Sequence, residues 1–357
     1  MKTPALPLTR DLVLIGGGHS HALVLRMWGM DPLPGARLTV INPGPTAPYS
    51  GMLPGFVAGH YDRDALDIDL VQLARFAGAR VILGAASGID HTAREIHVPG
   101  RPPVGYDVAS IDIGITSAMP DLPGFAEHAV PAKPLGPFAE AWDRYRAKDG
   151  PASVAVIGGG VAGAELAAAM AFALRRRGRA AQVHLVDNGA ALSALRPQAA
   201  SKLRAALAAQ GVTLHEQAKI TGVTAEGLRL ADGGEIAAQF ITGAASARPH
   251  GWLQTTGLAL THGFVSVSPT LQSSDPDIFA AGDCAHMAET PRPKAGVFAV
   301  RQAPVLFDNL RKRLSGEGTP RPYRPQRDYL KLISLGEKSA LADRFGLALS
   351  GPALWRW

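Results

Sequence analysis

Three glycines and an acid near the middle of the chain have the residue types and spacing of a dinucleotide-binding site. Gly158, Gly160 and Gly163 follow an apolar run that ends at Ile157, and Asp187 comes 24 residues after the third glycine (187 − 163). In such a turn the first glycine allows the bend, the second lets the backbone approach a pyrophosphate, and the third lets a helix pack on the strand. The helix N-terminus faces the phosphates, and the acid accepts hydrogen bonds from the adenosine ribose.

Asp187 also indicates which nicotinamide dinucleotide is bound. Its carboxylate repels a 2′-phosphate, and no arginine lies between Asn188 and Leu195 to attract one. The sequence therefore predicts NADH rather than NADPH.

A motif of the same kind near the N-terminus departs from this pattern at two positions. Gly16 and Gly18 occupy the first two glycine positions, but His21 stands at the third and Asn42 stands where the ribose acid is expected. An asparagine can still hydrogen-bond a ribose hydroxyl, and losing the third glycine costs packing closeness rather than the phosphate site.

His19 and Ser20 precede a helix predicted from Ala22 to about Met30. Two interpretations stay open for these side chains: they donate to a phosphate at the helix N-terminus, or they are exposed turn residues.

Each glycine motif joins an apolar strand to a helix, so the chain repeats one supersecondary unit. The interval of 142 residues (158 − 16) exceeds the period of solenoid repeats. We therefore expect two dinucleotide-binding folds in one α/β chain. The stretch 120–150 between them is rich in proline and glycine and is expected to be the link.

The single cysteine, Cys284, excludes a disulfide framework, a paired-cysteine redox motif, an iron–sulfur cluster and a thiolate zinc site. We predict no metal site, and any redox chemistry must come from a bound cofactor. Cys284 is expected to be a small buried residue, with a reactive thiol as the alternative.

Charge and hydropathy narrow the remaining classes. The formal net charge is +6, and the arginine run at 175–179 ends a predicted helix, where cations suit the helix dipole, so we expect no nucleic-acid partner. No apolar run reaches the length of about 18 residues that a membrane span needs, and the first ten residues lack the features of a signal peptide. We expect a cytoplasmic protein, either free or peripheral at the inner membrane face.

These motifs together resemble the pyridine nucleotide-disulfide oxidoreductase superfamily, whose members carry two dinucleotide folds. The resemblance covers about residues 11–310 and rests on the two glycine motifs, on Glu165 after the second, and on Ile-Phe-Ala-Ala-Gly-Asp at 278–283. The chain is most similar to the flavoprotein segment often fused ahead of selenide, water dikinase, through Gly-Gly-Gly-His-Ser-His at 16–21 and Tyr-Ser-Gly-Met-Leu-Pro-Gly at 49–55. That group in turn is similar to type II NADH:quinone oxidoreductases.

The resemblance implies an α/β fold with two Rossmann-like dinucleotide-binding domains. The FAD domain would be discontinuous, at 1–125 and 245–315, with the NAD domain inserted at 150–244. A short C-terminal α+β segment would follow at 320–357.

It also implies the cofactors and most of the site. The first motif would hold FAD together with Ser50, Gly51, Gly282 and Asp283, whose carboxylate would hydrogen-bond the ribityl chain; a helix cap is the alternative role for Asp283. The second motif, with Glu165, would bring NADH to the flavin.

Three further candidates lie near the expected flavin. Lys133 and Lys294 are candidate cationic neighbours of reduced flavin, with surface lysines as the alternative. Gly296–Gln302 matches the quinone-site pattern Ala-Gln-x-Ala-x-Gln of type II enzymes but has valine and arginine at the glutamine positions, and Phe298 is expected on an apolar wall there. We expect no protein nucleophile or catalytic triad.

The leading hypothesis is an FAD-dependent NADH dehydrogenase that reduces a quinone or a similar small acceptor. The alternatives are a soluble reductase linked to selenium or sulfur metabolism and a catalytically idle flavin-binding redox sensor. The apolar tail, which ends in Trp355-Arg356-Trp357, fits a membrane interface, a domain core or a homodimer contact.

Overall fold

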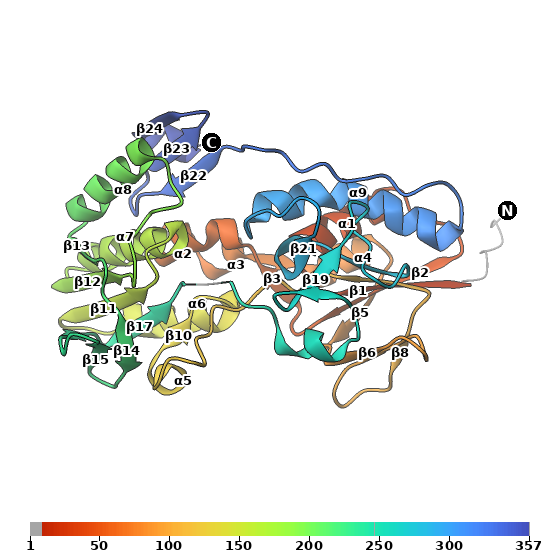
Figure 1. Ribbon diagram of the computed structural model, residues 1–357, viewed down its shortest axis with the longest axis horizontal. Helices are drawn as coiled ribbons and strands as arrows, with labels where there is room; N and C mark the ends of the chain where they lie inside the picture. Colours follow the sequence, from red (N-terminus) through yellow and green to blue (C-terminus); the bar gives the residue numbers. More distant parts are fainter. Residues whose placement is uncertain (1–8, 246, 357) are drawn as a thin grey trace. The chain divides into compact units, whose positions relative to one another are not determined.

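A computed structural model describes residues 9–245 and 247–356, and its chain divides into two compact units (Figure 1). The first unit contains the chain up to Tyr49, Asp67–Ile115 and Pro249–Pro325. The second contains Ser50–Leu66, Thr116–Arg248 and the chain from Gln326 onward. Trp357, at the end of the apolar tail, lies outside the described residues.

The first unit is built on a five-stranded parallel sheet with the order β20-β9-β1-β2-β5. Its strands are β1 (Arg10–Ile15), β2 (Ala36–Asn42), β5 (Arg80–Leu83), β9 (Val108–Ile111) and β20 (Ile278–Ala280). Because their faces are covered on both sides, the central strands read as continuous apolar runs in the sequence.

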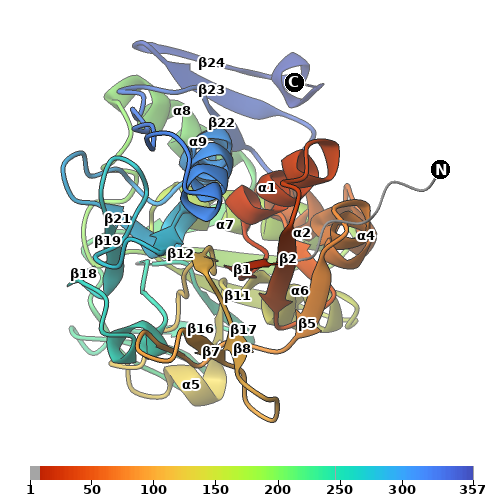
Figure 2. The same cartoon turned by 90° about the vertical axis from the view of Figure 1, so that its right-hand side faces the viewer.

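Helix α1 (His19–Met30) packs against α9 (Gly296–Ser315) and α4 (Leu70–Phe76). Both views place α1 and α9 over one face of the sheet, with the strands β6 to β8 on the other side (Figures 1 and 2). The smaller sheets of this unit are β3 (Thr46–Pro48) with β4 (Asp67–Asp69); β6 (Gly88–Asp90), β7 (Glu95–His97) and β8 (Val104–Gly105); and β18 (Leu260–Thr261), β19 (Phe264–Val267) and β21 (Ala285–Met287).

The second unit repeats the architecture, with a five-stranded parallel sheet in the order β10-β17-β11-β12-β13. Its strands are β10 (Val130–Pro131), β11 (Ala152–Ile157), β12 (Ala181–Val186), β13 (Val212–His215) and β17 (Phe240–Gly243). In both units the strand before the glycine turn lies in the middle of the sheet, so the expected duplication and the α/β class with parallel Rossmann-type sheets are confirmed.

Helices and two antiparallel sheets complete the second unit. The helices are α2 (Leu53–Val57), α3 (Arg63–Leu66), α5 (Phe125–His128), α6 (Leu135–Arg146), α7 (Val161–Arg176) and α8 (Pro197–Ala209). One sheet contains β14 (Ile220–Val223), β15 (Gly227–Leu230) and β16 (Glu235–Ala237), and the other contains β22 (Lys331–Ser334), β23 (Ala340–Arg344) and β24 (Leu347–Gly351).

Two segments are organised differently from the expectation. The stretch 120–150, expected as a link, forms α5, β10 and α6 and belongs to the second unit. The physical reason is the apolar side of α6, where Phe138, Trp142 and Tyr145 are buried in the core of that unit. The C-terminal strands and residues 50–66 also belong to the second unit.

Trp142 anchors α6 in this core. Its indole is fully buried, its ring centroid lies 5.5 Å from that of Phe240, and its Nε1–H donates to the Val57 carbonyl oxygen over 3.0 Å. Trp142→Ala should lower the free energy of unfolding by about 3–5 kcal/mol, because it leaves a large cavity. Trp142→Phe keeps most of the ring and should cost about 1–3 kcal/mol for the lost donor. Denaturant titrations measure both, and a loss below about 1 kcal/mol for the alanine variant would show that α6 is not anchored here.

Candidate functional site

The glycine turn of the second unit joins β11 to α7. Gly158 has φ +109°, a conformation that favours glycine, and Gly160 caps α7 with extended backbone. A Cβ at Gly163 would lie 1.9 Å from the Gly158 carbonyl oxygen, whereas a Cβ at Gly160 would meet no atom within 4 Å. The third glycine therefore lets the helix reach the strand, and the second leaves room for a phosphate to approach the backbone.

Asp187 follows β12 and is tied to this turn. Its Oδ2 accepts from the Gly159 N–H at 2.6 Å and its Oδ1 from the Gly189 N–H at 2.7 Å. These bonds hold a partly exposed carboxylate at the mouth of the turn, which fits the hydroxyls of an adenosine ribose.

Sequence reasoning missed an arginine near this turn. Arg204 donates to the Ala191 carbonyl oxygen at 2.9 Å, but it also forms a two-pronged ion pair with Glu216 at 2.7 Å. Glu216 in turn accepts from the Ala191 N–H. Because Glu216 balances this guanidinium, the arginine is less available to attract a 2′-phosphate.

Glu165, on α7, is engaged with the C-terminal sheet. Its carboxylate accepts from the Ser334 N–H at 2.7 Å, and burial raises its pKa to about 7. This contact lies within the second unit and gives Glu165 a structural partner, while its expected role in binding NADH stays a prediction.

The glycine turn of the first unit joins β1 to α1 with the same geometry. Gly16 has φ +90°, and a Cβ there would lie 2.4 Å from the Asp112 carbonyl oxygen. Asn42 Oδ1 accepts from the Gly17 N–H at 2.9 Å, as Asp187 does from Gly159, and its amide donates to the carbonyl oxygens of Gly44 and Thr46. Asn42 therefore occupies the position of the ribose acid without its charge.

The residues that open α1 point in different directions. His19 lies edge-on to the Tyr49 ring, with centroids 4.7 Å apart. The Ser20 hydroxyl donates to the Ala299 carbonyl oxygen of α9 at 2.9 Å, so this buried side chain binds protein rather than lying in an exposed turn.

His21, at the third glycine position, is fully buried between the turn and β9. Its Nδ1 lies 2.7 Å from the Gly16 carbonyl oxygen, and its Nε2 lies 2.8 Å from the Ser110 hydroxyl. Burial lowers the pKa of His21 to about 4, so the ring is neutral near pH 7.

Asp112, directly after β9, is a second residue that sequence reasoning missed. It is 2% exposed, and its Oδ2 accepts from the N–H groups of Ser20 and His21 at 2.8 and 3.2 Å. The available signal was an acid directly after the apolar strand that ends at Ile111.

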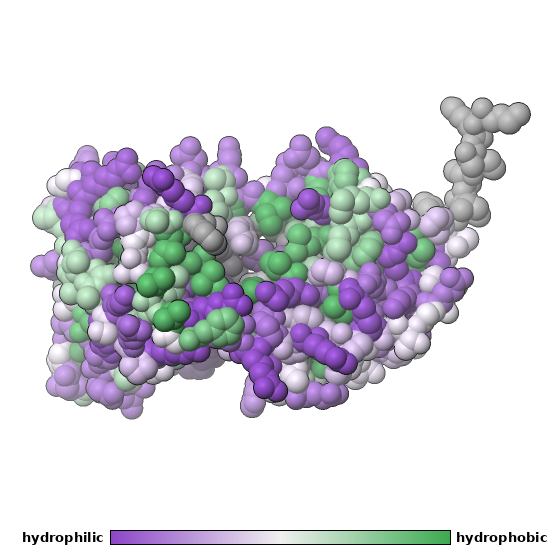
Figure 3. Space-filling model, turned by 90° about the horizontal axis from the view of Figure 1, so that it is seen from above, coloured by the Kyte–Doolittle hydropathy of each residue, from purple (hydrophilic) through white to green (hydrophobic). Residues whose placement is uncertain are grey.

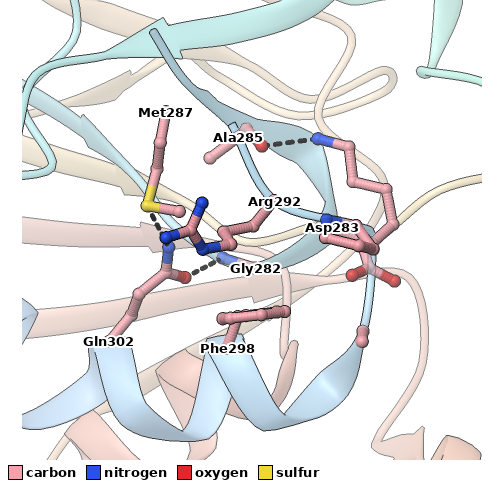
Figure 4. Close-up of a pocket in the computed structure, with 10 residues that line it drawn as sticks. Gly282, Asp283, Ala285, Met287, Arg292, Phe298 and Gln302 are labelled. Atoms are coloured by element: carbon pink, nitrogen blue, oxygen red, sulfur yellow. Dashed lines mark hydrogen bonds between the residues drawn. The ribbon is translucent and has the colours of Figure 1, made fainter. Parts of the chain in front are cut away.

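A pocket opens beside the turn that follows β20 (Figure 4). Gly282 has φ +68°, and its N–H donates to Gln302 Oε1 at 2.8 Å; the Gln302 amide nitrogen also lies 3.7 Å from Met287 Sδ. The pocket lining is Gly282, Asp283, Ala285, Met287, Arg292, Pro293, Lys294, Ala295, Phe298 and Gln302. It combines a carboxylate, two cations and one aromatic face.

The structure brings two of the three further candidates to this pocket. Lys294 Nζ donates to the Ala285 carbonyl oxygen at 2.6 Å and lies 3.9 Å from the centre of the Phe264 ring, and burial lowers its pKa. Phe298, on α9, is 5% exposed beside it. Lys133 belongs to the second unit, where its N–H donates to the Ser117 hydroxyl at 2.9 Å.

Ser50 and Gly51 form a short 3₁₀ turn, Ser50–Met52, at the start of a segment of the second unit. Their expected contribution to the flavin site stays a prediction.

Cys284 is fully buried, with Sγ 3.2 Å from the Ala281 carbonyl oxygen, and burial raises its pKa to about 12. The expectation of a buried structural cysteine is confirmed.

The residues present fit the two dinucleotides that the sequence predicts. The open space at Gly160 is where a pyrophosphate can reach backbone N–H groups, and Asp187 stands at the ribose position. In the first unit, Asn42 would take the ribose position, the Asp112 carboxyl group lies against the second glycine of the turn, and the Asp283 pocket lies at the carboxyl end of the sheet, where open α/β sheets bind ligands.

Comparison with known proteins places the chain in a family. The family model described as pyridine nucleotide-disulphide oxidoreductase matches residues 10–303. The chain belongs to this family. Its members depend on FAD and NAD(H), so the protein is an NAD(P)H-dependent flavoprotein oxidoreductase.

Individual relatives agree with this assignment. The chain is 26% identical over 97% of its length to the NADH dehydrogenase-like protein YutJ of Bacillus subtilis, covering 95% of that protein. It is 26% identical over 71% of its length to the demethylphylloquinone reductase NdbB of Synechocystis, covering 65% of it. The fold is similar to that of NDH2 from Plasmodium falciparum in complex with NADH, with TM-score 0.82, 11% identity, and coverage of 97% of this chain and 93% of the other.

Among residues 9–245 and 247–356, no helix combines the length and the apolar character needed to cross a membrane.

The geometry at Asp187 generates a prediction about cofactor choice. Its carboxylate can accept from two ribose hydroxyls but repels a 2′-phosphate, which should favour NADH over NADPH by about 2 kcal/mol, or roughly thirtyfold in kcat/KM. Asp187→Ser should narrow this ratio by about tenfold in steady-state kinetics with both nucleotides. Asp232→Ser, at an exposed turn of the same unit, is the matched control. Equal use of NADH and NADPH by the unaltered protein would contradict the role given to Asp187.

Proposed function

We propose that the protein is an FAD-dependent NADH dehydrogenase that passes electrons to a quinone or a similar small acceptor. The observation that carries this proposal is the pair of matching glycine turns, one with the ribose acid Asp187 and one in the unit that holds the Asp283 pocket. The names of two relatives, an NADH dehydrogenase-like protein and a demethylphylloquinone reductase, support the direction of electron flow and the acceptor class.

The chain's own residues would bind and orient the two cofactors. The flavin, when bound, would supply the redox chemistry, accepting a hydride from the nicotinamide and passing electrons to the acceptor. The turn at Gly160 and Asp187 would hold NADH. Asp283 would fix the ribityl chain, and Lys294 would place a cation near the flavin.

Electrons must leave the flavin directly, because the chain's single thiol is buried. With its pKa raised to about 12, Cys284 stays protonated and cannot relay electrons through a disulfide. The apolar face of Phe298 in the Asp283 pocket is suited to a flat quinone ring.

An anaerobic titration tests the function. Addition of NADH to the purified yellow protein should bleach the flavin absorbance, and a soluble quinone should restore it faster than air does. Faster recovery with a selenium or sulfur compound would favour a reductase of that metabolism instead. A flavin that NADH does not bleach would point to an idle redox sensor.

Phe298 tests the acceptor site. Phe298→Ala should slow reoxidation of the reduced protein by quinone about tenfold, because the ring loses an apolar contact surface worth about 1.5 kcal/mol. Val300→Ala, on the same helix but 41% exposed, is the matched control and should change little. Stopped-flow absorbance separates this step from reduction by NADH, and equal rates in both variants would remove Phe298 from the acceptor site.

We also infer a peripheral contact with an anionic membrane surface through the outer face of the β22–β24 sheet. In its register, Leu332 pairs with Ala342 and Ala342 with Leu349, while Arg344 pairs with Leu347. The alternate residues Ile333, Leu341 and Ala348 are buried, but Leu347 and Leu349 are 69% and 61% exposed. Figure 3 looks onto this side of the molecule and shows apolar side chains gathered among polar ones.

The charged residues around this face favour its binding to a bilayer that contains anionic lipids. Arg344 lies within the face, its guanidinium 4.4 Å from the ring of the 70% exposed Phe345. Arg327, Lys338 and Arg356 are exposed in the same C-terminal segment, which also exposes the acid Glu337, whereas Asp343 is buried and paired with Lys331. Apolar side chains with a basic rim bind the headgroup region of such bilayers.

Vesicle flotation tests this contact. The protein should float with vesicles that contain phosphatidylglycerol, and Leu347→Ser with Leu349→Ser should lower the bound fraction at least about tenfold through lost apolar burial. Met30→Ser, at a residue 61% exposed in the first unit, is the matched control. A dimer that the double variant breaks, without vesicle binding by the unaltered protein, would assign the face to a second copy of the chain.

A further inference from the structure

The two repeated sheets allow a residue-by-residue comparison of the two dinucleotide sites. Ile15 of β1 lies in register with Ile111 of β9, and Ile157 of β11 lies in register with Gly243 of β17. The next residue then donates its N–H to the carbonyl oxygen of that isoleucine, at 2.9 Å in the first unit and 2.8 Å in the second. This residue is Asp112 in the first unit and Ala244 in the second.

The presence of Asp112 in the first unit and of Ala244 in the second changes which atoms lie beside the second glycine of each turn. A Cβ on Gly160 would meet nothing within 4 Å. A Cβ on Gly18 would lie 2.2 Å from Asp112 Oδ1, and one on Gly282 would lie 2.4 Å from the same oxygen. The space that is open in the second unit is therefore taken by the Asp112 carboxyl group in the first.

The same carboxyl group uses donors that an anionic ligand would otherwise attract. Its Oδ2 accepts from the N–H groups of Ser20 and His21, the second and third residues of α1. A carboxylate at a helix N-terminus offsets the partial positive charge that makes this end attractive to phosphate.

The groups that face Asp112 leave its charge largely unbalanced. His21 of α1 is neutral near pH 7, and Cys284 after β20 stays protonated, since burial moves the pKa of His21 to about 4 and that of Cys284 to about 12. Asp283 places a second negative charge close to Asp112. Lys294 is a cation close to Asp283. On α9, Ala299 is bonded to Ser20 and Gln302 to Gly282, and neither of these α9 side chains carries a charge.

We propose that Asp112 is a proton-dependent positioning residue of the first dinucleotide site: a neutral Asp112 lets the α1 N-terminus hold the FAD diphosphate, and an ionised Asp112 weakens that hold. The inference rests on the proposed function, because it takes FAD as the ligand of the first unit. Burial, opposed by the two N–H bonds, raises the pKa of Asp112 to about 7, which brings its ionisation into the working range.

The direction of the pH effect follows from linkage. The diphosphate is negative throughout the range, so bound FAD raises the pKa of Asp112 further, and the protonated form binds more tightly. Affinity should therefore be constant below about pH 6, fall as pH rises through and above the pKa of the free protein, and level off when Asp112 is ionised in both states.

Release of FAD from the holoprotein tests the proposal. After dilution, recovery of FAD fluorescence gives the dissociation constant, which should rise about tenfold or more between about pH 6 and about pH 9. Asp112→Asn keeps an oxygen that can accept from Ser20 and His21 but carries no charge, so its dissociation constant should stay within about twofold over that range. Asp283→Asn should retain the pH dependence.

Three results would overturn the proposal. A pH profile of Asp112→Asn that matches the unaltered protein would show that Asp112 does not control binding. A profile that flattens only in Asp283→Asn would assign the effect to that residue. Failure of both the unaltered protein and Asp112→Asn to retain FAD at any pH would overturn the proposed function itself, and this inference with it.

Discussion

The close approach of a helix N-terminus to the end of a parallel strand is the constraint on which both units depend. Gly16 and Gly158 take left-handed backbone conformations there, and in each case a Cβ would collide with the backbone of the neighbouring strand's continuation, at Asp112 or Ala245. The turn therefore keeps the neighbouring strand in place and aims free N–H groups of the helix at the carboxyl edge of the sheet.

The two units differ in how the helix contacts the turn at the third glycine position. In the second unit, a Cβ at position 163 would lie only 1.9 Å from the Gly158 carbonyl oxygen, so only glycine fits there. His21 stands at the corresponding position of the first unit and places its ring inside, against the Gly16 carbonyl oxygen and the Ser110 hydroxyl. Because the ring is neutral, one nitrogen can donate to the carbonyl while the other accepts from the hydroxyl. A hydrogen-bonded side chain thus replaces direct contact between backbone atoms.

Local signals explain what could be predicted from the sequence. Each glycine turn is fixed by residues a few positions apart, and Asp187 directly follows the next strand, so spacing alone indicates the turns and the acid. The acid directly after the strand that ends at Ile111 was a local signal for Asp112. The pairing of β9 with β1, which brings Asp112 to the glycine turn, joins residues 96 positions apart (108 − 12), and no local pattern indicates that pairing. The stretch 120–150 was misread for a related reason: its prolines and glycines suggested a link, but burial of Trp142 decided its fold.

The placement of carboxylates distinguishes two sites that share one architecture. In the second unit the charge stands at Asp187, the adenosine end, and Ala244 leaves the helix N-terminus open. In the first unit the corresponding position carries the neutral Asn42, and the carboxyl group of Asp112 stands against the helix N-terminus. A repeated fold by itself would give both turns the same preference, since their backbones are alike. The exchange of acid for neutral residue at two corresponding positions gives each turn its own electrostatics.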